Sequence, residues 1–141
     1  MHHLIYLSQA TRPLSANALT CLVEQARQAN ERQHITGALV YGNKRFIHIL
    51  EGEQAVVEEA YARIGQDPRH MHLCKVAEYP VAARRFAEWP LAFQALSAAQ
   101  FAHLAGYLAP TQLARDLPAY NPVATSFLEA IRALVQLPAA K

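Results

Sequence analysis

The 141-residue chain is 52% hydrophobic and 17% charged, the size and composition of one folded domain with a substantial core. Its net charge of +2 comes from scattered basic residues, so neither nucleic acid nor a membrane is an expected partner. No apolar run approaches the roughly 20 residues that cross a bilayer, and the amino terminus lacks a signal peptide's pattern, so we expect a cytoplasmic protein.

The first predicted elements are a strand and a helix. Residues 3–8 are apolar and rich in residues that favour strands. Ser15 is a candidate N-cap for a helix that runs to about Arg27 or Asn30. The apolar residues of this helix recur at three- and four-residue spacing and predict one buried face: Leu19, Leu22, Val23 and Ala26.

A β-hairpin is predicted next. Residues 35–41 form its first strand, in which Gly37 permits close approach of a neighbouring backbone. Gly42 and Asn43 are expected to supply the positive-φ residues of the turn. The returning strand is predicted over residues 45–50.

The middle of the chain completes a recognisable order of elements. Helical periodicity covers residues 54–66 and ends at Asp67-Pro68, because proline disfavours helical backbone in the residue before it. Strands are predicted over residues 72–79 and 91–96. The resulting βαββαβ order with one extra strand predicts an α+β, ferredoxin-like fold with two helices on one face of the sheet.

Two further helices are predicted over residues 98–108 and 123–136. We expect them to cover the sheet face that the first two helices leave open. Residues 98–141 are therefore interpreted as a helical extension of the same structural domain as residues 1–97. The apolar character of these helices also predicts self-association, as a dimer or a ring.

A set of polar, aromatic and small residues is distributed along these elements. They are Tyr6, Asn30, Ile35-Thr36-Gly37, Phe46, Leu50-Glu51-Gly52, Tyr61, Arg63, Asp67-Pro68-Arg69-His70, Phe86 and Trp89. In this order and spacing, over roughly residues 3–96, they resemble the BLUF family of blue-light sensors, which bind flavin adenine dinucleotide between the two helices. The trailing helices resemble those of short members without an enzymatic output domain.

The resemblance implies a role for each matching residue. Tyr6 would give an electron to the excited flavin, and Asn30 would fix the polar edge of the ring. Leu22 and Ile64 would enclose the ring, while Trp89 would lie on the last strand and report the change outward. The remaining residues implied to contact the cofactor are Phe46, Arg63, Asp67, Arg69 and His70.

His48 occupies the position where the family usually has a glutamine that bridges the tyrosine and the flavin. A neutral histidine also offers one donor and one acceptor, but on a rigid ring. Its reference pKa of about 6.5 would make the site sensitive to pH. Two lesser departures are Ala29, in place of an amide, and Pro90-Leu91, in place of a serine-methionine pair.

The resemblance therefore implies a flavin-binding, blue-light regulatory module that signals through an unidentified protein partner and is not an enzyme. FAD is the expected cofactor, with FMN or no cofactor as alternatives. The alternative function is an interaction or oligomerisation module with the same fold and no photochemistry. An acylphosphatase-like hydrolase is disfavoured because the first loop has Arg12 but no glycines to cradle phosphate.

Each candidate also has a purely structural interpretation. Tyr6 and Trp89 could be core aromatic residues, and His48 a tolerated core histidine. Asn30 could be a helix C-cap, since asparagine tolerates left-handed backbone. Arg63 and Asp67 are four residues apart and could form a surface ion pair.

The two cysteines, Cys21 and Cys74, lie in apolar stretches and predict no disulfide framework. His70, His72 and Cys74 alternate along one predicted strand and have the chemistry of zinc ligands. No fourth ligand has matching spacing, so no metal site is expected.

Overall fold

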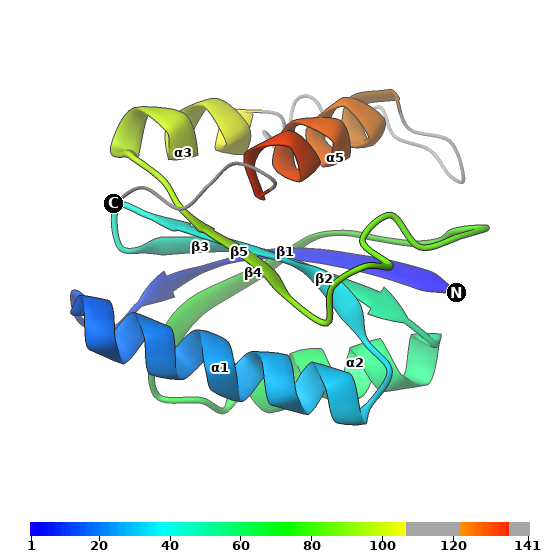
Figure 1. Ribbon diagram of the computed structural model, residues 1–141, viewed down its shortest axis with the longest axis horizontal. Helices are drawn as coiled ribbons and strands as arrows, with labels where there is room; N and C mark the ends of the chain where they lie inside the picture. The colour runs from blue at the N-terminus through cyan, green and yellow to red at the C-terminus, as the bar shows by residue number, and fades with distance from the viewer. Residues whose placement is uncertain (107–121, 136–141) are drawn as a thin grey trace.

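A computed structural model describes residues 1–106 and 122–135. The elements are β1 (His2–Ala10), α1 (Ala16–Arg32), β2 (Thr36–Gly42), β3 (Arg45–Gly52), α2 (Gln54–Gly65), β4 (His70–Pro80), β5 (Ala92–Ala95), α3 (Ala98–Gly106) and α5 (Pro122–Val135). Five strands form one sheet in the order β4-β1-β3-β2-β5, with α1 and α2 on one face and α3 and α5 on the other (Figure 1). The predicted α+β, ferredoxin-like fold is confirmed.

Neighbouring strands are antiparallel except for β2 and β5, which run parallel with Ala38 opposite Ala92. The central pair is β1 and β3, in a continuous register that sets His3 opposite Glu51 and Tyr6 opposite His48. Because side chains alternate between the two faces of a strand, these two pairs lie on opposite faces of the sheet.

The first helix begins as predicted and ends later than predicted. The Oγ of Ser15 accepts a hydrogen bond from the backbone N–H of Ala18 at 3.1 Å, as an N-cap does. The helix continues to Arg32 and its C-cap is Gln33, so the interpretation of Asn30 as a C-cap is wrong. The left-handed residue that follows the helix is His34, with a φ of 56°.

The hairpin turn lies one residue later than predicted. Asn43 and Lys44 have φ values of 51° and 61°, whereas Gly42 belongs to β2 and is paired with Arg45. Two central residues with positive φ form the turn type whose twist matches that of the flanking strands. Gly42 has a packing role instead, since a Cβ there would lie 3.0 Å from a side-chain atom of Phe101.

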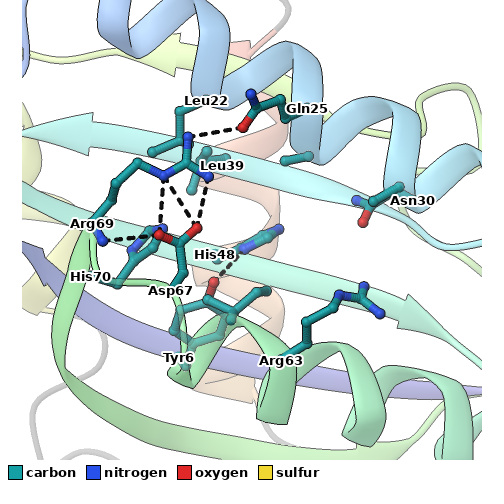
Figure 2. Close-up of a pocket in the computed structure, with 13 residues that line it drawn as sticks. Tyr6, Leu22, Gln25, Asn30, Leu39, His48, Arg63, Asp67, Arg69 and His70 are labelled. Atoms are coloured by element: carbon teal, nitrogen blue, oxygen red, sulfur yellow. Dashed lines mark hydrogen bonds and ion pairs between the residues drawn. The ribbon is translucent and has the colours of Figure 1, made fainter.

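The core on the α1 and α2 face is divided into two clusters. The cluster beneath α2 contains Leu4, Tyr6, Ile35, Leu50, Val57 and Ala60. The cluster beneath α1 contains Ala10, Leu22, Val23, Leu39, Phe46 and Leu91. The two helices therefore rest on separate parts of the sheet, and Figure 2 shows the side chains that lie between them.

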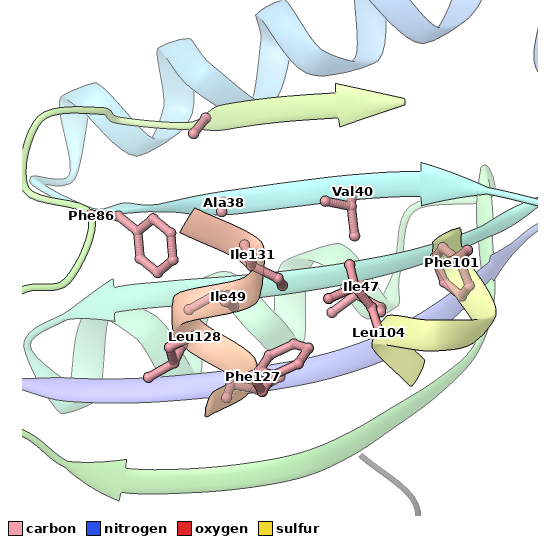
Figure 3. Close-up of a cluster of buried hydrophobic side chains, with 12 residues drawn as sticks. Ala38, Val40, Ile47, Ile49, Phe86, Phe101, Leu104, Phe127, Leu128 and Ile131 are labelled. Atoms are coloured by element: carbon pink, nitrogen blue, oxygen red, sulfur yellow. The ribbon is translucent and has the colours of Figure 1, made fainter. Parts of the chain in front are cut away.

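The opposite face has one continuous core. Residues of β1, β2 and β3 pack there against α3, α5 and Phe86 (Figure 3). Its buried members include Ile5, Ala38, Val40, Ile47, Ile49, Phe86, Phe101, Leu104, Phe127, Leu128 and Ile131. The C-terminal helices thus cover the face that α1 and α2 leave open. The boundary proposed at residue 97 remains a prediction, and the ends of the two predicted helices, at 107–108 and 136, lie outside the described residues.

A buried carboxylate joins this second face to the segment before β5. Glu51 is fully buried, and its Oε2 lies 2.6 Å from Nε2 of the buried His3. Its carboxylate also accepts hydrogen bonds from the Thr36 hydroxyl at 2.8 Å and from the backbone N–H groups of Arg85 and Phe86. Burial alone would raise the pKa of Glu51, but these hydrogen bonds hold it below its ordinary value.

Cys21 and Cys74 are both exposed, so the prediction that they lie in apolar surroundings is wrong. Within residues 1–106 and 122–135, no helix has the length and apolar character needed to cross a membrane.

The close contact at Gly37 makes a stability prediction. A Cβ at this position would lie 1.9 Å from the backbone oxygen of Ile49, so Gly37→Ala requires β2 and β3 to move apart. We expect a loss of about 2–3 kcal/mol in the free energy of unfolding, measured with urea. Gly106→Ala is the matched control, because a Cβ there meets nothing within 4 Å. Equal stability of the two variants would contradict the prediction.

Candidate functional site

A cavity of about 200 Å³ lies between α1 and α2, above β1 and β3 (Figure 2). The helices supply apolar walls, with Leu22 from α1 and Ile64 from α2. The full lining is Tyr6, Leu22, Gln25, Ala26, Ala29, Asn30, Leu39, His48, Arg63, Ile64, Asp67, Arg69 and His70. The cavity occupies the gap between the two clusters of the divided core.

The floor of the cavity holds a tyrosine–histidine pair. Tyr6 and His48 face each other across β1 and β3, and the Tyr6 hydroxyl lies 2.6 Å from Nδ1 of His48. The two residues are 1% and 3% exposed, so this hydrogen bond is shielded from water. The pair follows directly from the strand register, which sets the two side chains side by side on the same face.

Burial fixes the protonation state of both residues. It lowers the pKa of His48 to about 3, with a further contribution from nearby His70. It raises the pKa of Tyr6, with Tyr61 and Asp67 acting in the same direction. Both side chains are therefore neutral at pH 7. The pH-sensitive site expected from an ordinary histidine is a wrong prediction, because burial moves the titration of His48 well below the physiological range.

The second ring nitrogen of His48 has no hydrogen-bond partner. Among the buried side-chain nitrogen and oxygen atoms of the described residues, Nε2 of His48 stands alone in this respect. A buried polar atom left unpaired costs about 1–3 kcal/mol. Since His48 lines the cavity, a bound molecule with a polar edge would complete the hydrogen bonding of this ring.

Asn30 marks another polar point on the wall. It lies in the last turn of α1, it is 4% exposed, and its Nδ2 donates to the carbonyl of Pro90 at 2.8 Å. The sequence placed Asn30 beside a ligand, and the structure adds that its amide ties α1 to the segment before β5. Asn30 therefore faces both the cavity and the chain that leads to the last strand.

Charged residues gather at one end of the cavity. Arg69 donates to the Asp67 carboxylate through Nη2 at 2.7 Å and through Nε, and to Gln25 through Nη1 at 2.9 Å. The hydrogen bond from Arg69 lowers the pKa of Asp67. Arg63 donates instead to Gln33 at 3.0 Å. The alternative interpretation of Arg63 and Asp67 as an ion pair is therefore wrong, because α2 ends at Gly65 and Asp67 no longer follows helical spacing.

His70 completes this end of the cavity. Its Nδ1 lies 3.1 Å from the Ser8 hydroxyl, and its ring packs at 4.8 Å from the ring of Phe46. Burial lowers the pKa of His70. The predicted alternation of His70 with His72 and Cys74 is interrupted, because His72 has a φ of 54° at a bulge in β4. Within the described residues, no group of three potential ligands is placed to hold a metal ion.

Two of the residues implied by resemblance do not line the cavity. Phe46 is fully buried beneath α1 and contacts Tyr41 and His70. Trp89 precedes β5 and packs on the core of the opposite face, with the guanidinium of Arg132 at 5.2 Å from its ring centre. The sequence indicated that Trp89 lies on the last strand, and the strand in fact begins at Ala92.

The resemblance implies no cofactor contact for four of the lining residues, although it marks Ala29 as standing in place of an amide. Gln25, Ala26 and Ala29 follow Leu22 at three-, four- and seven-residue spacing on α1, so the helical period could have found them. Leu39 could not be found in this way. It lines the cavity because the β2–β3 register sets it opposite His48.

This geometry is typical of a small-molecule binding domain: a concave, mostly apolar site with few polar groups. Residues 1–92 match the BLUF family, described as sensors of blue light using FAD, and the chain belongs to this family. Members of this family use a flavin, which is consistent with a cavity that presents an unpaired polar atom between aliphatic walls.

Similar proteins include one curated relative and two solved structures. The photoactivated adenylate cyclase subunit beta of Euglena gracilis is 42% identical over 89 residues, which are 62% of this chain and 10% of that protein. The chain thus spans about a tenth of that relative's length. The structure of BlsA in its photo-activated state has a TM-score of 0.74 and 22% identity, covering 99% of this chain and 98% of its own. The dark-state structure of BlrB, a BLUF protein, has a TM-score of 0.71 and 25% identity, covering 94% and 95%.

The low pKa of His48 predicts a specific dependence of stability on acid. The unfolded chain binds a proton at His48 below about pH 6.5, while the folded protein does not until about pH 3. The stability that this difference contributes is complete above pH 6.5 and is lost as the pH falls, at about 1.4 kcal/mol per pH unit. His48→Gln should therefore show a shallower fall in the free energy of unfolding between pH 6 and pH 4, measured with urea.

The same comparison at pH 8 and pH 9 serves as its control. His48 is neutral in both the folded and unfolded states there, so wild type and His48→Gln should have equal slopes. Parallel stability curves across pH 4–6 as well would mean that His48 takes up a proton in the folded protein.

Proposed function

We propose that this chain binds FAD between α1 and α2 and acts as a blue-light-responsive regulatory module. Its membership of a family of blue-light sensors supports this function. The single observation that carries the proposal is the unpaired Nε2 of His48, in a cavity wall, on a ring already bonded to the buried Tyr6. FMN remains an alternative cofactor because it shares the same ring system.

The cavity suits the ring of a flavin better than its tail. An isoalloxazine is apolar on its faces and polar at its rim, which fits aliphatic walls from Leu22 and Ile64 with His48 and Asn30 at the edge. A volume of about 200 Å³ is smaller than the roughly 300–1,000 Å³ that encloses a drug-sized ligand. We therefore place the phosphate-bearing tail at the charged end, where the side chain of Arg69 is 40% exposed.

When bound, the flavin would supply absorption of blue light and an acceptor for one electron. Tyr6 is the phenol that lines the cavity, and its hydroxyl oxygen lies 2.6 Å from Nδ1 of His48. A proton that passed to Nδ1 would charge the buried ring, which the low pKa of His48 disfavours. The ring would therefore release its other proton from Nε2 to an acceptor atom at the edge of the flavin, which would balance the electron that the flavin had accepted. His48 is proposed as a two-sided proton carrier in place of the family's glutamine.

Contacts of the cavity wall continue to the opposite face of the sheet. The amide of Asn30 holds the carbonyl of Pro90, and Trp89 next to it lies beneath the guanidinium of Arg132 on α5. Arg132 also donates to the carbonyl of Arg85 at 2.7 Å. We propose that movement of this segment alters how α5 meets a protein partner. The output would then be a contact with another protein and not catalysis, and self-association through α3 and α5 remains a prediction.

The second candidate is an interaction module that has no photochemistry. The rigid ring of His48 favours it, because an imidazole cannot rotate to exchange donor and acceptor as an amide can. Under this alternative, partner binding and assembly are indifferent to light and to flavin.

The visible spectrum of the purified protein tests the function. With FAD added in the dark the protein should become yellow, and blue light should move its visible band to longer wavelength, reversibly. Tyr6→Phe should keep the colour and lose the shift, because the electron donor is gone. A protein that stays colourless would refute flavin binding, and a yellow protein with no shift would favour the second candidate.

Replacing His48 tests its part separately. His48→Gln restores an amide that can rotate, so this variant should show at least as large a red shift as wild type in the same measurement. If wild type lacks the shift and His48→Gln gains it, the imidazole is the cause. If neither wild type nor His48→Gln shows a red shift, Ala29 or the segment before β5 is the remaining difference to test.

A further inference from the structure

The direction of the hydrogen bond between Tyr6 and His48 can be worked out from the groups around it. His48 is buried and neutral, so it carries one N–H, on either Nδ1 or Nε2. In the described part of the chain, the Tyr6 hydroxyl has one hydrogen-bond partner, Nδ1 of His48. The two possible positions of the histidine proton therefore leave different atoms unpaired.

If Nδ1 carried the proton, it would donate to Tyr6. The Tyr6 hydrogen would then have no acceptor and the Nε2 lone pair no donor. If Nε2 carries the proton, Tyr6 donates to Nδ1 at 2.6 Å and the N–H at Nε2 is the one group left over. The second arrangement leaves fewer buried groups unpaired, and buried groups in folded proteins are almost always paired.

It follows that His48 presents a donor to the cavity and requires an acceptor from whatever binds there. This inference rests on the proposed function, since it concerns the form of flavin that the site takes. The central edge of an oxidised flavin carries acceptors, a ring nitrogen and a carbonyl oxygen. Reduction by two electrons adds a hydrogen to that nitrogen and turns this acceptor into a donor.

We propose that His48, held in its Nε2–H form by Tyr6, makes the cavity select oxidised flavin over reduced flavin. A reduced ring would set one N–H against another. The Nε2–H group would then have the carbonyl oxygen as its one acceptor at this edge, and moving the histidine proton to Nδ1 instead would leave the hydrogen of Tyr6 without an acceptor. Tyr6 is thus a positioning residue for this selection, in addition to its role as electron donor. A glutamine at position 48 would not select in this way, because its amide can rotate to offer its oxygen.

The first test locates the proton in the protein without flavin. Protein labelled with ¹⁵N in histidine should give an NMR signal for His48 with a protonated Nε2 and an unprotonated Nδ1 at pH 7. A protonated Nδ1 would overturn the inference at this step, whatever the protein binds.

The second test measures the reduction potential of bound FAD at an electrode, which supplies the two electrons while the buffer supplies protons. Selection of the oxidised form makes the potential more negative, by about 30 mV for each tenfold difference in affinity. Wild type should therefore lie at least about 30 mV below both Tyr6→Phe and His48→Gln, in which the donor at Nε2 is no longer fixed.

His103→Gln is the matched control, because it makes the same substitution at an exposed residue of α3, on the other face of the sheet. It should keep the wild-type potential. Equal potentials in wild type, Tyr6→Phe and His48→Gln would overturn the inference while leaving flavin binding and the light response intact. Failure of wild type to take up FAD would refute the proposed function, and the selection with it. Tyr6→Phe and His48→Gln change different residues. If one of these variants does not fold, the reduction potential of the other still tests the inference.

Discussion

The register between β1 and β3 is the constraint on which the rest of this structure depends. It sets two polar pairs in the middle of the sheet, Tyr6 with His48 on one face and His3 with Glu51 on the other. A slip of one residue would turn every side chain of one strand to the opposite face of the sheet. The four polar side chains would then lie among apolar residues without their partners. Both faces of β1 and β3 are buried, so it is the cost of leaving buried polar groups without partners that favours this register.

The two pairs have different tasks because their surroundings differ. Glu51 accepts from His3, Thr36 and two backbone N–H groups, so its carboxylate is fully occupied. It fastens the segment before β5 to the sheet. His48 has one partner and one unpaired nitrogen, and it lies beside a cavity. A polar network in which every group has a hydrogen-bond partner holds the scaffold in place. A network with one unpaired group beside a cavity is suited to binding a ligand.

Much of the scaffold could be predicted from the sequence. The apolar spacing around Leu22 gave the first helix, Ser15 gave its start, and the order of elements gave the fold class. The errors in the predicted elements arose where contacts between residues distant in the sequence override the local sequence pattern. The turn was predicted at Gly42-Asn43 and lies at Asn43-Lys44, because Gly42 pairs with Arg45 as part of the hairpin.

The site was predictable only in part. Tyr6, Asn30 and the residues around Asp67 were found through a resemblance, not through helical or strand periodicity. The Arg63–Asp67 ion pair failed because helical spacing ends with the helix at Gly65. Which face Trp89 packs on, and that burial lowers the pKa of His48 to about 3, depend on neighbours distant in the sequence. The unpaired Nε2 is a property of the folded arrangement and has no signature in the sequence.

The divided core has a consequence for the stability and lifetime of the protein when no flavin is bound. Helices α1 and α2 rest on separate clusters with a cavity between them, so neither buttresses the other through a shared apolar layer. A molecule bound in the cavity would contact both clusters and so fill the gap in the core. Its binding free energy would add to the stability of the fold. Protein without flavin would open more often between α1 and α2 and would be degraded by proteases sooner. The supply of pigment would then govern how much receptor persists as well as how much of it can respond.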